Sequence, residues 1–136
     1  MIYRTPWHLV CSGRLPPYCA ASGGPCPTFH TQVAQTAACN NHHPVDARLA
    51  RWLLMAHDRA ERDEFPMTHE FMSLMLGTRR PSISVAAAVL QKAGAIGYTH
   101  GRMRVLDRAG LEAASCECYG TVREQFEYLL GVPAGE

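Results

Sequence analysis

The sequence lacks the long apolar run that a membrane-spanning helix requires. Hydrophobic residues make up 47% of the chain, yet no stretch approaches the roughly 18 consecutive apolar residues needed to cross a bilayer. The N-terminal segment also lacks an unbroken apolar core of the length found in secretory signals. We therefore expect a cytoplasmic protein with one compact domain and flanking segments, since 136 residues are short for two domains.

The sequence also lacks the motifs that mark common catalytic sites. It contains no glycine-rich phosphate loop, no nucleophile elbow and no paired metal-binding histidine motif. We interpret His57 and His69 as surface or capping residues rather than as catalysts. We therefore expect no enzymatic activity, no catalytic residue and no cofactor.

The sequence also lacks a large excess of positive or negative charge: its formal net charge is only +1. The charge is nevertheless unevenly distributed along the chain. Residues 67–108 hold six Lys or Arg against two Asp or Glu, a net of +4, and the other positions hold seven against ten, a net of −3. A local concentration of positive charge is what attracts phosphates. We therefore look for a nucleic-acid-binding surface within residues 67–108.

Residues 67–94 have the pattern of two helices joined by a tight turn. Thr68 can cap the first helix, because its side-chain oxygen can accept from an otherwise unpaired backbone N–H. The apolar residues that follow at helical spacing are Phe71, Met72 and Met75. Gly77 supplies the backbone freedom that a sharp turn needs, and Pro81 suits the first turn of a second helix.

The second helix should begin near Arg79. Its apolar residues at helical spacing are Ile83, Ala86, Ala87 and Leu90. The residues left for other faces are Arg79, Arg80, Ser82, Ser84 and Gln91. Two arginines and two hydroxyls thus crowd one N-terminal turn, which is the end that reaches base edges in a helix-turn-helix. The alternative is an ordinary helical hairpin whose arginines are merely solvated.

The next segment, residues 95–107, predicts a β-hairpin with a basic tip. Two apolar runs flank His100 and Gly101, and the second run alternates apolar residues with Arg102 and Arg104. A helix-turn-helix followed at once by a basic hairpin is the arrangement of a winged helix. We therefore predict an α+β fold, mainly α with a small β-hairpin wing.

Residues 67–90 and the hairpin after them resemble the DNA-binding domain of the Crp/Fnr family of bacterial transcription regulators. The resemblance rests on Thr68 opening the first helix, Gly77 in the turn, Arg80 beginning the recognition helix, and the run 100–102 in the wing. It extends over about residues 35–130. It implies that Arg80 binds a guanine edge and that Thr68 and the wing touch phosphates.

The chain departs from that family at one informative position. Many members carry a glutamate immediately after the arginine, where it accepts a hydrogen bond from cytosine, and this chain has Pro81 there. Proline offers no side-chain acceptor. The usual base sequence of the family therefore cannot be carried over to this protein.

Together, the residues and the resemblance predict a DNA-binding transcriptional regulator. Its recognition helix, about residues 79–93, should lie in the major groove of double-stranded DNA, and its wing, about residues 96–106, should lie on phosphates. The expected base contacts are Arg79, Arg80, Ser82 and Ser84. The expected phosphate contacts are Thr68, His69, His100, Arg102 and Arg104. We expect two copies to read a two-fold site as a weak or DNA-dependent homodimer.

The whole chain divides into four regions. Residues 1–27 are rich in proline and cysteine and should form an irregular or disordered extension. Residues 28–43 correspond to a remnant of the family's dimerisation helix, residues 44–131 to the winged helix, and residues 132–136 to a tail. The roughly 40 residues ahead of the winged helix are too few for the β-roll sensor of full-length relatives, so we expect that sensor to be absent.

Outside the helix-turn-helix, apolar spacing predicts further helices. One should begin at Pro44, end near Arg62 and leave Arg48 and Arg51 mostly in solvent. Asp107 should cap another, and residues 122–130 should form the last. Asn40 should break the helix that precedes Pro44, and residues 64–67 should be an extended link.

The cysteines and two histidines include residue types that bind metal ions. Cys116 and Cys118 are close enough to contact one metal, and Cys39, His42 and His43 are also of metal-binding types. However, the spacing of Cys116 and Cys118 is not that of a zinc knuckle, and no second matched pair exists, so reduced and partly buried cysteines are favoured. The alternatives to a DNA-binding regulator are thus a metal- or redox-sensing regulator that uses Cys116 and Cys118, and a winged-helix protein-interaction module.

Overall fold

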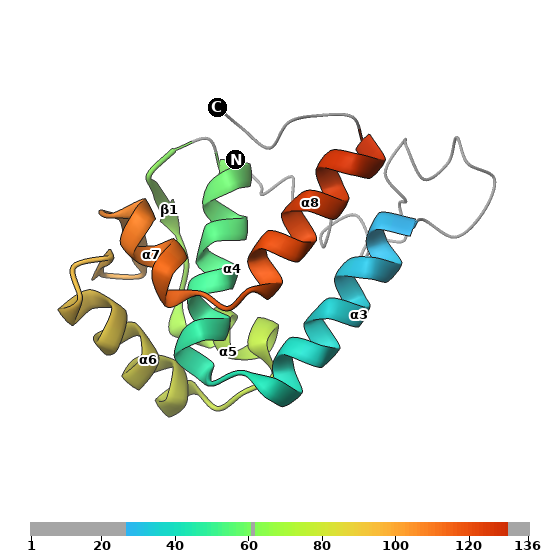
Figure 1. The fold of residues 1–136 in the computed structure, drawn as a ribbon. Coiled ribbons are helices and arrows are strands. Elements are labelled where there is room, and N and C mark those ends of the chain that lie inside the picture. The colour runs from blue at the N-terminus through green and yellow to red at the C-terminus, as the bar shows by residue number, and fades with distance from the viewer. Residues whose placement is uncertain (1–26, 61, 131–136) are drawn as a thin grey trace.

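The computed structural model describes residues 27–60 and 62–130 (Figure 1). The predicted extension up to residue 26 and the tail lie outside the described residues. The helices are α3 (Pro27–His42), α4 (Val45–Ala60), α5 (His69–Leu76), α6 (Arg80–Lys92), α7 (Arg108–Ala114) and α8 (Cys118–Leu130). The strands are β1 (Glu64–Pro66), β2 (Ile96–Thr99) and β3 (Arg102–Val105). In this described part, no helix is long and apolar enough to span a bilayer.

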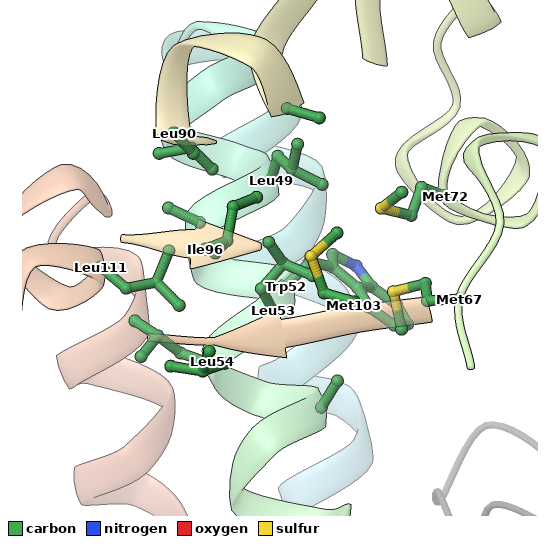
Figure 2. Packing of buried hydrophobic residues seen from close by; sticks show 14 of the residues in the cluster. Leu49, Trp52, Leu53, Leu54, Met67, Met72, Leu90, Ile96, Met103 and Leu111 are labelled. Carbon is green, nitrogen blue, oxygen red and sulfur yellow. The ribbon is translucent and has the colours of Figure 1, made fainter. Parts of the chain in front are cut away.

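Helix α4 occupies the centre of the fold and packs against α5, α6, α7 and α8 (Figure 1). Figure 2 shows Ile96 of β2 and Met103 of β3 facing the leucines of α4, with Leu90 and Leu111 closing the same core. Fully burying a side chain such as Leu53 or Ile96 stabilises the fold by about 1.5–3 kcal/mol. This single core holds α5, α6 and the hairpin in fixed positions.

The prediction that Arg48 and Arg51 face solvent is wrong, because their side of α4 is also covered. Arg48 is 8% exposed and donates through Nη2 to the carbonyl of Leu76, at the C-terminal end of α5. Arg51 is 2% exposed and donates through Nη2 to Thr36 Oγ1 on α3, at 3.3 Å. Periodicity within α4 carries no information about these neighbouring segments.

The helix-turn-helix forms as the sequence predicts. Thr68 caps α5 by accepting from the backbone N–H of Phe71 at 3.1 Å. Gly77 ends that helix in the left-handed region, with φ 59° and ψ 39°. The predicted apolar face of α6, comprising Ile83, Ala86, Ala87 and Leu90, is buried. Phe71, in contrast, lies at the surface.

The wing contains one strand more than the predicted hairpin. Strand β1, in the segment expected to be an unpaired link, pairs with β3 and gives an antiparallel sheet in the order β1-β3-β2. Pro66 is compatible with this strand because β1 lies at the sheet edge. His100 and Gly101 form the hairpin turn with φ values of 50° and 76°, the conformation of a tight two-residue turn.

The remaining helices differ from the predictions mainly at their ends. Asp107 caps α7 as expected, since its Oδ1 accepts from the N–H of Gly110 at 3.0 Å. Helix α8 begins at Cys118 rather than at residue 122. Helix α3 continues through Asn40, where a break was predicted, and ends at His42. Helices α3 and α8 pack directly against each other (Figure 1).

Candidate nucleic-acid interface

The N-terminal turn of α6 lacks the capping residue and the negative charge that usually stabilise the start of a helix. Arg79 occupies the N-cap position without a capping hydrogen bond from its side chain, and the first turn contains no acidic residue. The positive end of the helix dipole therefore carries Arg79 and Arg80, where cations are unfavourable. Both arginines are exposed, and neither forms an ion pair with any residue in the described ranges. Such a concentration of unpaired positive charge attracts an anionic partner.

Helices α5 and α7 provide an internal comparison. Helix α5 has Thr68 as its cap and Glu70 in its first turn, and α7 is capped by Asp107. These ends follow the preference for capping oxygens and negative charge. The start of α6 departs from that pattern at two adjacent positions, and departures of this kind are expected at functional sites.

His69 connects α5, α6 and the wing. Its Nδ1 lies 3.0 Å from Ser84 Oγ on α6, and its ring stacks on Tyr98 of β2 with 4.4 Å between ring centroids. Its Nε2 is buried and has no hydrogen-bond partner in the described structure. Burial, and then the charge of Arg80, lower the pKa of His69, so the ring is uncharged near neutral pH. In this structure His69 is a packing residue, and its expected phosphate contact remains a prediction.

Two predicted hydroxyl contacts are already engaged within the domain. Ser84 donates from Oγ to the carbonyl of Arg80 at 3.2 Å, besides its contact with His69. Thr68 uses a lone pair of Oγ1 to cap α5, but its own hydroxyl hydrogen remains available as a donor. Thr68 therefore keeps the ability to bind a phosphate oxygen, whereas Ser84 is turned back toward its own helix.

The turn of the wing lies against the start of α5. The backbone N–H of Met67 donates to the carbonyl of Gly101 at 2.8 Å, and a Cβ at Gly101 would lie 3.7 Å from Cγ2 of Thr68. His100, beside this contact, is exposed. The structure thus brings Thr68 and the tip of the wing together, although they are more than 30 residues apart in the sequence.

Arg102 and Arg104 point outward from β3 and share one carboxylate. Arg102 donates through Nε to one oxygen of Glu64, and Arg104 donates through Nε to the other at 3.0 Å. Hydrogen bonds from Arg102 and then Arg104 lower the pKa of Glu64, so this carboxylate is charged near neutral pH. The wing therefore carries less positive charge than its sequence suggests.

Sequence reasoning missed two features of this surface. Glu64 lies on a strand that was not predicted, and only its in-and-out alternation with Phe65 signals that strand. Val85 projects from α6 with 67% of its surface exposed, one turn after Pro81. Helical spacing from Pro81 could have identified Val85 as an outward-facing position.

Comparisons with known proteins agree with the winged helix-turn-helix fold. The family model of the Crp-like helix-turn-helix domain matches residues 47–114. Among solved structures, the chain is similar to TTHB099, a transcriptional regulator of the CRP family from Thermus thermophilus. The TM-score is 0.55, with 29% identity over 62% of this chain and 46% of that one. The chain thus spans less than half the length of TTHB099, and no curated protein matches it.

Proposed function

Because the chain belongs to the family with a Crp-like helix-turn-helix domain, a family of DNA-binding transcriptional regulators, we propose that it reads a specific DNA sequence through the N-terminal end of α6. In this proposal α6 enters the major groove and the β2-β3 wing lies along phosphates. The regulator acts in the cytoplasm and performs no catalysis.

The uncapped, doubly basic first turn of α6 is the observation that carries this proposal. Arg80 has the planar fork of donors that matches O6 and N7 of guanine, and Arg79 and Ser82 lie beside it at the same helix end. Pro81 supplies no acceptor for cytosine, so a base other than cytosine can occupy the neighbouring position. The exposed methyl groups of Val85 suit contact with a thymine methyl in the same groove.

Phosphate binding is assigned to the start of α5 and to the wing. Thr68 donates its hydroxyl hydrogen, and His100, Arg102 and Arg104 supply polar or charged groups from the wing. His69 and Ser84 act as positioning residues, because their contact joins the first turn of α5 to α6. Phosphate contacts made in this way fix the register of α6 on the duplex without reading its sequence.

Paired alanine substitutions test this division of labour. Arg80→Ala is expected to weaken binding to the cognate site by about 1–3 kcal/mol and to relax specificity at one base pair. Arg102→Ala is expected to weaken binding to all sequences similarly and to reduce the salt slope by about one unit. Arg123→Ala, on α8, is the control and should leave both quantities unchanged.

Fluorescence anisotropy with cognate and random duplexes across a salt series provides both measurements. Equal losses on the two duplexes for Arg80→Ala and Arg102→Ala would contradict the assignment of roles. If the wild-type chain shows no salt-dependent binding to any duplex, the domain is a protein-interaction module instead, because phosphate contacts release counterions.

A further inference from the structure

Three buried cysteine side chains meet where α3 and the start of α8 come together. Cys39 lies on α3, Cys116 precedes α8, and Cys118 is the first residue of α8. Their sulfur atoms all lie within 4.8 Å of one another, and Sγ of Cys39 is 3.5 Å from Sγ of Cys116. Helices α3 and α8 run side by side at this point (Figure 1). The fold thus joins Cys39 to a pair 77 residues further along the chain.

Arg51 supplies an independent observation beside these sulfurs. Its side chain is almost completely buried, its Nε has no hydrogen-bond partner, and it forms no ion pair within the described ranges. Arg51 lies close enough to Cys39 for its charge to act on that thiol. A guanidinium does not lose its proton in proteins, and buried charges are normally paired. A negative charge is therefore expected at the cysteine cluster.

We propose that Cys39, Cys116 and Cys118 bind one thiophilic metal ion, Zn²⁺ or an ion of similar softness, as three thiolates. Each thiol loses its proton on binding, so three protons are released and the zinc-trithiolate unit carries one net negative charge. Arg51 balances that charge. Zn–S bonds of about 2.3 Å place tetrahedral sulfurs about 3.8 Å apart, close to the spacing of this cluster.

The surroundings of the cluster fit a bound ion. Gln35 on α3 donates from Nε2 to Sγ of Cys118 at 3.0 Å, as outer groups that support a metal ligand do. A surface hollow of about 450 Å³ is lined in part by Cys116 and Tyr119. The hollow borders one of the three proposed ligands, so an ion would enter the cluster from this side.

Metal-free forms of the cluster leave Arg51 uncompensated. Three neutral thiols would give the buried guanidinium no counter-charge. A disulfide between Cys39 and Cys116 would likewise be neutral and would exclude Cys118. A metal-thiolate site uses all three sulfurs and supplies the counter-charge. Its structural effect would be to tie α3 to α8.

Metal analysis of the full chain tests the proposal. Cys11, Cys19 and Cys26 lie outside the described residues, so a background variant replaces all three with Ser to remove their thiols. After anaerobic purification with a reductant and exposure to Zn²⁺, this variant should retain one zinc per chain. It should also give a thiolate-to-cobalt charge-transfer band with Co²⁺.

Further single substitutions in that background locate the ligands. Cys39→Ser, Cys116→Ser and Cys118→Ser should each abolish stoichiometric zinc and the cobalt band. Absence of zinc from the background variant, retention of zinc by Cys39→Ser, or a persistent disulfide between Cys39 and Cys116 would overturn the proposal.

Substitution of Arg51 tests the role of charge without removing a ligand. Arg51→Met should weaken zinc binding by about tenfold or more, measured by competition with a chelator. Arg51→Lys retains the charge and should weaken it less. Equal zinc affinity for Arg51→Met and Arg51→Lys would contradict the charge balance, and folding of each variant is checked by circular dichroism.

Discussion

At the scale of single residues, Arg79 and Arg80 stand at a position where other side chains would stabilise the protein more. The first turn of α6 offers unpaired N–H groups and a positive dipole, for which a capping oxygen or a carboxylate is the favoured partner. Under the proposed function, arginine at these positions serves DNA binding rather than folding. Stability and DNA affinity should therefore respond in opposite directions to the same substitution.

Arg79→Ser tests this opposition. Serine is a favoured N-cap residue, so the free energy of unfolding should rise by about 0.5–2 kcal/mol, as measured by urea denaturation. Affinity for the cognate duplex should fall in the same variant. A less stable Arg79→Ser protein, or one with unchanged affinity, would argue against a binding role for this helix end.

Glu64→Gln addresses the second charged feature, the carboxylate shared by Arg102 and Arg104. The substitution removes one negative charge from the wing, so binding to random duplexes should become stronger and its salt dependence steeper. Stability should change little, because solvent screens these surface ion pairs. If non-specific affinity stays the same, Arg102 and Arg104 do not lie on phosphates.

At the scale of elements, the sequence correctly predicts those features that depend only on neighbouring residues. The cap at Thr68, the turn at Gly77, the apolar face of α6 and the hairpin around His100 are determined by neighbouring residues, and all are confirmed. Strand β1 escaped prediction because its partner, β3, lies almost 40 residues away. The burial of Arg51 also depends on another element, α3, which the periodicity of α4 does not reveal.

In the candidate site, too, features that depend on neighbouring residues were predictable and features that depend on tertiary contacts were not. The exposure of Arg80 was predictable from helical periodicity, whereas the pairing of Glu64 with the wing arginines was not. The contact of His69 with both Ser84 and Tyr98 also requires three elements to be in place. Sequence thus identifies which end of α6 is unusual, and tertiary structure identifies which polar groups are already engaged.

Gly77 lies in the turn between α5 and α6, and Gly120 in α8 serves as its matched control. Neither glycine has an atom within 4 Å of an added Cβ, but only Gly77 has a positive φ. Gly77→Ala should therefore destabilise the protein by about 1–2 kcal/mol. Gly120→Ala, within α8, should be neutral or stabilising by up to about 1 kcal/mol. Similar midpoints of thermal unfolding for both variants would contradict this account of the turn.

At the scale of the whole molecule, the strength of the proposed dimer is limited by the small exposed apolar surface of α3. This helix packs against α8, and Val33 is its exposed large apolar residue among those described. We therefore expect weak or DNA-dependent dimerisation, visible by sedimentation as a predominantly monomeric chain that pairs on a two-fold duplex. A tight dimer at nanomolar concentration without DNA would contradict this expectation.

The family assignment and the winged-helix fold, both predicted from the sequence, are confirmed by the match over residues 47–114 and by the observed order of elements. The distribution of charge along the chain also belongs to the scale of the whole molecule. The net positive charge of residues 67–108 coincides with α5, α6 and the wing, which meet around His69. This coincidence makes one continuous surface the expected site of contact with DNA.

Selection of duplexes from a random pool tests the central claim most directly, because it requires binding, sequence specificity and symmetry together. The wild-type chain should enrich a two-fold sequence containing a guanine in each half-site, and Arg80→Ala should lose the preference at that guanine alone. Recovery of unenriched DNA, or of the same motif with an undiminished guanine for Arg80→Ala, would contradict reading by the first turn of α6.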